Sequence, residues 1–174
     1  MTIRRGLSVE LDEIRSVIRA ANEEFRDLTP AGFFRAYLAS ALDVWGRMEH
    51  GTVIVAESEG RLVGTVTFFP DANDEGTPTT FGPGTAGLRA TAVHPEARGL
   101  GIGRRLVEAC IERAVASGAT SIALHTADFM RAAVQLYERT GFRRSPAHDF
   151  PVAEFFPSDP DVDLVAITYV RDLP

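Results

Sequence analysis

The sequence predicts an α/β fold whose central sheet is mixed, mostly antiparallel and flanked by helices. The first two strand patterns of the chain are joined by a short turn, as in an antiparallel hairpin. After residue 86, strand patterns alternate with amphipathic helix patterns, which is typical of helices packed on a sheet. Because 174 residues suffice for one core and no internal repeat is visible, we expect a single domain over residues 1–174.

Two helices are expected before the first strand. Ser8 is a suitable N-cap for the first helix, and Thr29-Pro30 opens the second with a cap and a proline at the first helical position. The second helix is expected to end at Gly46. The apolar stripe of the first is Leu11, Ile14, Ile18, Ala21 and Phe25. That of the second is Phe34, Leu38, Leu42 and Trp45.

The later elements follow from apolar periodicity and from the turn residues between them. Strands are expected at 52–57, 62–69, 86–93, 121–126 and 164–170. Helices are expected at 101–117 and 130–140, the first of them closed by Gly118.

The composition restricts the class of protein. A hydrophobic content of 45% and a charged content of 24% are ordinary for a globular domain. The net charge of −6 argues against a general nucleic-acid binder. Cys110 is the only cysteine, which excludes an intrachain disulfide and cysteine-pair metal sites, and we expect no metal. No long apolar run follows the first residues, so we expect no membrane partner and a cytoplasmic location.

The most informative segment is the run from Ala92 to Arg105, which reads as a strand end, a glycine-rich turn and a helix start. Glycines at 99, 101 and 103 let the backbone turn sharply and let a ligand approach closely. The first turn of a helix offers unpaired N–H groups to a phosphate, and Arg98 and Arg104 add positive charge. The alternative is a plain tight connection between a strand and a helix.

Spacing narrows the choice of ligand. A P-loop needs Lys-Ser/Thr after its last glycine, but Arg104-Arg105 follows Gly103. The dinucleotide fingerprint needs Gly-x-Gly-x-x-Gly, which the spacing here does not match. The pattern Arg98-x-x-Gly101-x-Gly103, after a Val-x-Pro turn, resembles the acyl-coenzyme A signature of the GCN5-related N-acetyltransferase family.

A second segment is similar to another landmark of the same family. Residues 136–142 read Leu-Tyr-x-x-x-Gly-Phe and end a helix on which Ala133, Val134 and Tyr137 share one face. The two landmarks occur in the family order with the strand 121–126 between them, and the resemblance covers about residues 88–144. One departure is Met130, where the family often has asparagine.

The resemblance implies a fold and a set of site residues. The fold would be that of the acyl-CoA acyltransferases, and the activity transfer of an acetyl group from acetyl-CoA to a primary amine of a small molecule or peptide. The diphosphate would lie on the main chain of Arg98, Gly99, Leu100, Gly101, Ile102, Gly103 and Arg104. Main-chain groups of Ala92 and Val93 would contact the pantetheine arm, and an N–H of this strand would polarise the thioester carbonyl. Tyr137 would protonate the departing thiolate; from helical spacing alone it is an ordinary core tyrosine.

The base that deprotonates the amine is not evident. Relatives often carry a glutamate on the strand equivalent to 86–93, but this strand offers Arg89 and Thr91. Six other side chains are candidates: Glu23, Glu24, His94, Glu96, His125 and Asp128. Because no base is evident, a non-catalytic acyl-CoA sensor stays open as an alternative function. The oligomeric state is also open, and a homodimer is possible. Acylation of a tRNA-linked amine would want a basic face that this composition does not promise.

Two stretches have no regular pattern. Residues 70–85 are rich in Pro, Gly, Thr and Asp and form either a lip over a cleft or a disordered connection. Residues 145–163 combine four prolines with apolar side chains, so we expect them to pack on the body of the protein or to line the acceptor site. The aromatic side chains of Phe33, Phe34, Tyr37 and Trp45 are expected in the core, with some at the edge of that site.

Overall fold

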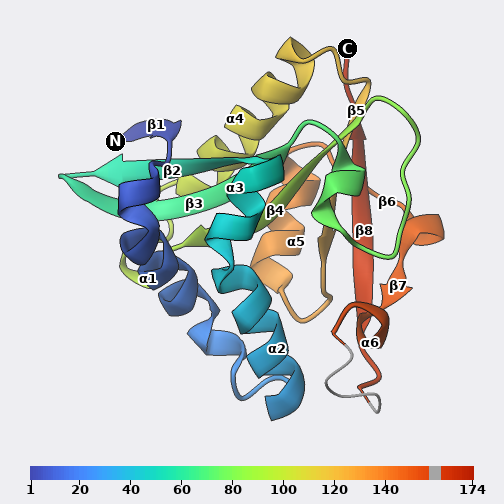
Figure 1. Ribbon diagram of the computed structural model, residues 1–174, viewed down its shortest axis with the longest axis horizontal. Helices are drawn as coiled ribbons and strands as arrows, with labels where there is room; N and C mark the ends of the chain where they lie inside the picture. The colour runs from blue at the N-terminus through green and yellow to red at the C-terminus, as the bar shows by residue number, and fades with distance from the viewer. Residues whose placement is uncertain (157–161) are drawn as a thin grey trace.

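A computed structural model describes residues 1–156 and 162–174 and contains one mixed sheet (Figure 1). The strand order is β1-β2-β3-β4-β5-β8-β6, and β7 also pairs with β8. Neighbouring strands are antiparallel except β4 and β5, which run parallel. This confirms the predicted fold class. The strands are β1 Thr2–Arg5, β2 Thr52–Ser58, β3 Arg61–Phe69, β4 Thr85–Val93, β5 Ser121–Thr126, β6 Arg143–Arg144, β7 Phe150–Pro151 and β8 Val165–Asp172.

Helices cover both faces of this sheet. The α-helices are α1 Leu11–Asn22, α2 Ala31–Leu42, α3 Val44–His50, α4 Ile102–Ala116, α5 Arg131–Arg139 and α6 Val152–Phe155. Figure 1 shows α1 and α3 on one face and α4 on the other. Short 3₁₀ helices lie at Ser8–Glu10, Glu23–Phe25, Ala72–Glu75, Pro95–Ala97 and Pro146–His148.

The alternation of side chains along β2 divides the core into two layers. Ile54 and Ala56 face α4, where they pack with Leu106 and Cys110. Val53 and Val55 point to the opposite face and pack against α1, with Ile14 and Ile18 among their neighbours. Because β2 is apolar on both faces, it is a central strand rather than a half-exposed one.

The N-terminal helices begin and end differently from the prediction. The side chain of Ser8 makes no cap hydrogen bond; instead, the Glu10 carboxylate accepts from the Leu7 N–H, with 2.8 Å between the heavy atoms. Pro30 is the N-cap of α2 rather than its first helical residue. Asp43 interrupts the expected second helix and caps α3 by accepting from the Gly46 N–H at 3.1 Å. Gly46 therefore lies inside α3, and Trp45, expected in the core, is 55% exposed.

The two irregular stretches pack on the sheet and on each other. The first contains the 3₁₀ helix Ala72–Glu75, which Asp71 caps through the Asn73 N–H. The Thr79 hydroxyl donates to the His148 carbonyl at 2.7 Å, and the rings of Phe81 and His148 stack. Residues 157–161 of the second stretch lie outside the described residues. Both stretches contribute side chains to the smaller pocket described below.

Sequence patterning missed the short strands β1, β6 and β7. Each has four residues or fewer, so no alternation of apolar and polar side chains can be recognised in it. None of the helices in the described residues combines the length and the apolar character that a bilayer span requires.

Replacement of Leu106 by alanine tests the α4 layer of the core. The side chain is fully buried, so Leu106→Ala is expected to lower the free energy of unfolding by about 3 kcal/mol, measured by urea denaturation. Val115→Ala on the same helix is the control, because Val115 is 42% exposed and the change should stay within about 0.5 kcal/mol. Equal losses in both variants would contradict the assignment of Leu106 to the core.

Candidate functional site

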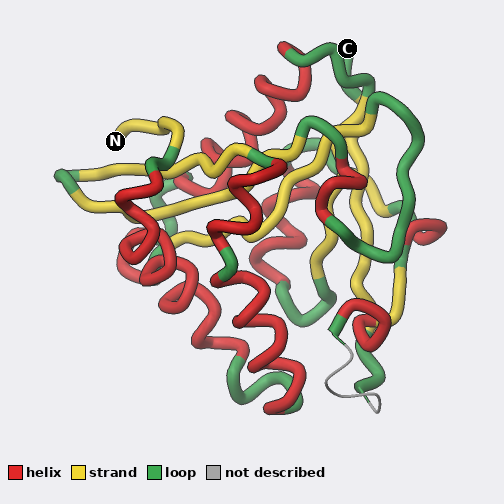
Figure 2. Tube along the Cα trace, viewed as in Figure 1, coloured by secondary structure: helices red, strands yellow, loops and turns green. Residues whose placement is uncertain are grey.

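Strands β4 and β5 separate after only three paired residues, which opens a gap in the middle of the sheet. Pairing is confined to Thr85–Gly87 of β4 and Ser121–Ala123 of β5. β4 then continues to Val93 and β5 to Thr126 without pairing to each other, and Figure 2 shows the two strands diverging. We call the space beyond these pairs the β4–β5 gap. Main-chain polar groups along it need partners that the neighbouring strand does not supply.

A β-bulge in β4 accompanies this divergence. Ala92 is opposite Thr65 and Arg89 is opposite Thr67, so Ala90 and Thr91 together face the single residue Val66 of β3. Ala90 adopts φ 55°, a left-handed conformation that costs a residue with a side chain about 1–2 kcal/mol. A bulge increases the local twist and bends its strand, which turns the end of β4 away from β5.

The bulge also sets which main-chain groups face the gap. The His94 N–H donates to the Val63 carbonyl at 2.9 Å, and Val93 is the next residue in the register, opposite Gly64. In an antiparallel pair the hydrogen-bonding direction alternates, so the N–H and C=O of Val93 point away from β3 toward the gap. Ala92 is registered with Thr65, and its main chain faces β3.

The loop between β4 and α4 presents a continuous run of free donors. The first hydrogen bond of α4 runs from the Arg105 N–H to the Gly101 carbonyl at 3.1 Å. Within the part of the chain that the structure describes, the N–H groups of residues 99–104 donate to no protein atom. Gly99 and Gly101 have φ of 78° and 75°, which explains the glycines, and open space lies where a Cβ would be.

The two arginines of the loop are both paired with carboxylates. Arg98 donates to Glu24 at 2.8 and 3.1 Å and to the Ala21 carbonyl at 3.0 Å, which ties the loop to the C-terminal end of α1. Arg104 donates to Glu108 on its own helix at 2.7 Å, and its side chain is 70% exposed. The free donors at the loop are therefore the main-chain N–H groups.

Gly103 and Tyr137 belong to the contact between α4 and α5. A Cβ on Gly103 would lie 3.1 Å from Leu136 Cδ2, so glycine lets α5 approach closely. Tyr137, which follows Leu136 in α5, is 5% exposed, and its ring packs edge-to-face with that of Phe142. Burial raises the pKa of Tyr137 to about 12. The phenol therefore keeps its proton at neutral pH.

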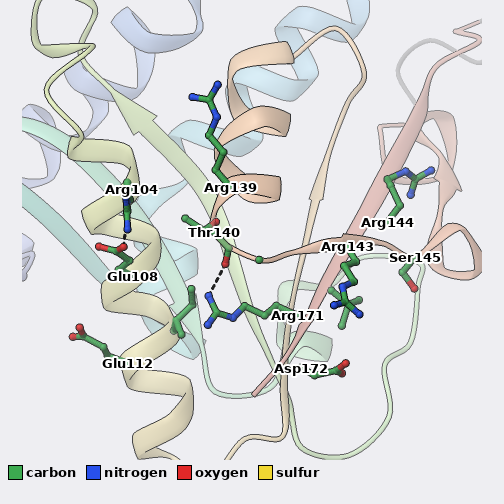
Figure 3. Close-up of a pocket in the computed structure, with 13 residues that line it drawn as sticks. Arg104, Glu108, Glu112, Arg139, Thr140, Arg143, Arg144, Ser145, Arg171 and Asp172 are labelled. Atoms are coloured by element: carbon green, nitrogen blue, oxygen red, sulfur yellow. Dashed lines mark hydrogen bonds and ion pairs between the residues drawn. The ribbon is translucent and has the colours of Figure 1, made fainter. Parts of the chain in front are cut away.

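Figure 3 shows a groove rich in arginine between α4 and the C-terminal end of α5. Its volume is about 830 Å³, and residues of β6 and β8 line it as well. Arg104, in the first turn of α4, is one of its lining residues, and the Arg171 guanidinium donates to the Thr140 carbonyl. Arg139 and Arg143 form no ion pair with any residue that the structure describes.

A smaller pocket of about 110 Å³ lies in the β4–β5 gap, and we call it the aromatic pocket. Arg89 and Ala90 of β4 line one side, and His125 and Thr126 of β5 line the other. Its aromatic walls come from α2 and from the segments near residues 129 and 150–156. They are Phe33, Tyr37, Phe129, Phe150, Phe155 and Phe156, and Glu75 and Thr77 complete the lining from the first irregular stretch.

Burial shifts the pKa of four ionisable groups in this pocket, and it raises the pKa of Tyr37 to about 12. It raises the pKa of Glu75 to about 8, with the Arg89 charge acting in the opposite direction. It lowers the pKa of His125 to about 4, so the imidazole is neutral at pH 7. It also lowers the pKa of Arg89, whose guanidinium donates to Ser40 Oγ at 2.8 Å and to the Glu75 carbonyl at 3.3 Å.

Of the six proposed bases, the structure brings only His125 to the aromatic pocket. Glu24 is paired with Arg98, and His94 lies in the turn after β4, where its ring accepts from the Glu96 N–H. Glu75 was missed because an acid beside Asp71 and Asp74 in a Pro/Gly-rich stretch resembles a solvated loop. The signal that marks it is its burial, which only the fold reveals.

Replacement of Glu75 tests the burial of its carboxyl. Because its folded pKa lies above its ordinary value of 4.5, the folded state binds the proton more tightly, and stability is lost as the pH rises from about 4.5 to about 8. Glu75→Gln should remove a loss on the order of 4 kcal/mol between pH 5 and pH 9 in denaturant titrations. Asp74→Asn, at an exposed neighbour, should keep the wild-type slope. An unchanged slope in Glu75→Gln would show that the carboxyl is solvated.

Comparison with known proteins places this chain in a family. Residues 15–142 match the model of the acetyltransferase (GNAT) family. An uncharacterized N-acetyltransferase of Schizosaccharomyces pombe is 31% identical over 149 residues, which cover 84% of this chain and 85% of the relative. A Xenopus tropicalis protein named "Probable N-acetyltransferase camello" is 36% identical over 105 residues, 59% of this chain but only 43% of the relative.

A solved structure has the same fold. The PaiA N-acetyltransferase of Thermoplasma acidophilum, crystallised with coenzyme A, superposes with a TM-score of 0.70 at 14% identity, over 99% of this chain and 100% of the other. The family match covers more than half of the sequence and includes both the glycine loop and Tyr137. The chain belongs to the acetyltransferase (GNAT) family.

Proposed function

We propose that the protein transfers an acetyl group from acetyl-CoA to a primary amine. The observation that carries this proposal is that two sets of free main-chain donors lie on one path. The free N–H groups of residues 99–104 follow the free edge of β4 at Val93 after one short turn. A diphosphate followed by an amide-rich arm matches this arrangement, since each part can accept from or donate to unpaired backbone.

The residues present fit such a ligand. The loop N–H groups would hold the diphosphate through its oxygens, and the cationic groove beyond Arg104 would face a further phosphate of the same ligand. The main-chain N–H and C=O of Val93 would hydrogen-bond to the pantetheine arm, which would lie beside β4 where a neighbouring strand is missing. Ala92, Arg98 and Arg104 stay predicted contacts of the cofactor, and the structure gives Arg98 a second role in fixing the loop to α1.

The chemistry needs no covalent enzyme intermediate. Acetyl-CoA supplies an activated acyl group, and the protein contributes orientation of the amine against it. Main-chain N–H groups at the bulge would stabilise charge on the acyl oxygen. Tyr137, protonated at neutral pH, would give its proton to the sulfur as it departs.

The activity is tested by following free thiol while acetyl-CoA is incubated with polyamines, amino acids, aminoglycosides and N-terminal peptides. Amine-dependent thiol release is the expected result. Tight binding of acetyl-CoA without turnover on the whole panel would instead indicate a sensor. Absence of acetyl-CoA binding in calorimetry would refute both.

Tyr137→Phe tests the proton donor. The variant keeps the ring and its packing, so kcat is expected to fall about 100-fold while the Kd of acetyl-CoA changes less than about twofold. Tyr169→Phe is the matched control, since Tyr169 is equally buried but its hydroxyl donates to Glu138 at 3.0 Å, away from the gap. Equal effects of the two variants on kcat would remove Tyr137 from the chemistry.

Gly101→Ala tests the loop as the diphosphate site. A side chain at φ 75° strains the loop by about 1–2 kcal/mol and should weaken acetyl-CoA binding about tenfold in calorimetry. Gly118→Ala carries the same strain at φ 78° at the other end of α4, also in open space. It should lower the melting temperature similarly but leave the Kd unchanged. A weaker Kd in both variants would mean that the loop has no specific role.

A further inference from the structure

Unpartnered polar atoms gather in the aromatic pocket. Among the described residues, five buried side-chain atoms lack a hydrogen-bond partner: Glu75 Oε1, Thr77 Oγ1, Thr91 Oγ1 and both ring nitrogens of His125. Four of these five belong to residues that line this one pocket. Folded proteins pair nearly all such groups, so a cluster of exceptions in a cavity indicates a ligand that completes them.

The charges in the pocket indicate what that ligand carries. Among the lining residues, Glu75 has the only carboxyl, and Arg89 has the only fixed positive charge. Arg89 already has partners in Ser40 Oγ and the Glu75 carbonyl, and its guanidinium lies 4.9 Å from the centre of the Phe155 ring. The Glu75 carboxyl, whose pKa burial raises to about 8, thus has an unpartnered oxygen, whereas the Arg89 guanidinium is paired. A cationic N–H donor would satisfy that oxygen and favour the ionised form of the carboxyl.

The walls and the size restrict the rest of the ligand. Six aromatic rings surround the polar cluster, and such rings attract an ammonium group and bury an apolar arm. A volume of about 110 Å³ corresponds to about four water molecules, which is room for a short chain of atoms rather than a large ring system. A bulkier remainder would extend out of the pocket.

The carboxyl of Glu75 reaches the centre of the sheet because β4 has no side chain there. A Cβ on Gly87 would overlap Glu75 Oε1, so the carboxyl occupies the place of the missing side chain. Gly87 is the last residue of β4 that pairs with β5, so this oxygen lies where the β4–β5 gap begins. Glu75 also lies within electrostatic range of Tyr137, whose pKa its charge raises.

We propose that the aromatic pocket binds the acceptor as a primary ammonium on a short apolar arm, and that Glu75 is the base that deprotonates it. This inference rests on the proposed acetyl transfer. The ammonium gives one proton to the Glu75 carboxylate, and the free nitrogen attacks the thioester carbonyl carbon. A C–N bond forms as the C–S bond breaks, and the sulfur leaves with the bonding electrons. It takes a proton from Tyr137, which recovers one from the acetylated nitrogen.

His125 and Thr77 complete the site without carrying charge. The neutral His125 ring can accept an N–H of the ammonium through one nitrogen, and the Thr77 hydroxyl can accept another. The titratable groups that face Glu75 in this pocket are Arg89, His125 and Tyr37. Burial raises the pKa of Tyr37 to about 12, so only Glu75 titrates between pH 7 and pH 9 among them.

The binding part is tested without turnover, with n-butylamine as the probe and n-butanol as its neutral counterpart. The Glu75 side-chain carboxyl is observed by ¹³C NMR and assigned from its loss in Glu75→Gln. n-Butylammonium should shift this signal and move its titration to lower pH, while n-butanol should do neither. Equal responses to both compounds, or no response to the amine, would overturn the proposal.

The catalytic part is tested by the kinetics of acetyl transfer to n-butylamine, or to the best amine of the panel above. Glu75→Gln should lower kcat/KM at least about 100-fold and abolish its rise between pH 7 and pH 9. Asp74→Asn on the same 3₁₀ helix should stay within about twofold of wild type, and the Kd of acetyl-CoA should be unchanged in both.

A second variant guards against misfolding of the first. Gly87→Ala places a methyl group where Glu75 Oε1 lies, so it displaces the carboxyl without removing it and should reproduce the kinetic loss. If wild type fails to bind acetyl-CoA, the proposed function itself is wrong. If wild type turns over but folded Glu75→Gln keeps its rate and pH profile, only the role of Glu75 is wrong.

Discussion

The site depends on the early end of hydrogen bonding between β4 and β5. Only three residues of each strand pair, although both strands continue. A mixed sheet that stayed paired would have no unsatisfied backbone at its centre and no cavity between these strands. The bulge at Ala90 and Thr91 bends β4 away, and the strain at Ala90 is offset by the packing of the surrounding sheet. The gap, the free edge at Val93 and the aromatic pocket all follow from this one irregularity.

The C-terminal end of α1 connects the two halves of the site. Arg98 of the glycine loop bonds to Glu24 and to the Ala21 carbonyl. One residue further, Asn22 accepts a hydrogen bond from the Tyr37 hydroxyl at 2.9 Å, and Tyr37 lines the aromatic pocket. The loop and the pocket therefore share one rigid support, so their separation is set by a short stretch of helix rather than by loops.

The sequence predicted the parts of the molecule that rest on local patterns. The fold class, the glycine loop and the helix that carries Tyr137 were recognisable because their spacing reflects helix and turn geometry. Trp45 and Gly46 were misplaced because Asp43, a capping residue, divides one apolar pattern into two helices. Glu75 was invisible because its burial depends on contact with a strand that begins ten residues later, and on the missing side chain of Gly87. The pairing of Arg98 with Glu24 is likewise a contact between distant segments.

Gly87 and Glu75 cannot be considered as independent positions. The volume that one leaves free is the volume that the other fills, so the present position of the Glu75 carboxyl depends on the glycine at 87. A Cβ at position 87 would displace the Glu75 carboxyl and would lie 3.1 Å from the Ala72 Cα. The two positions are thus expected to change together during divergence.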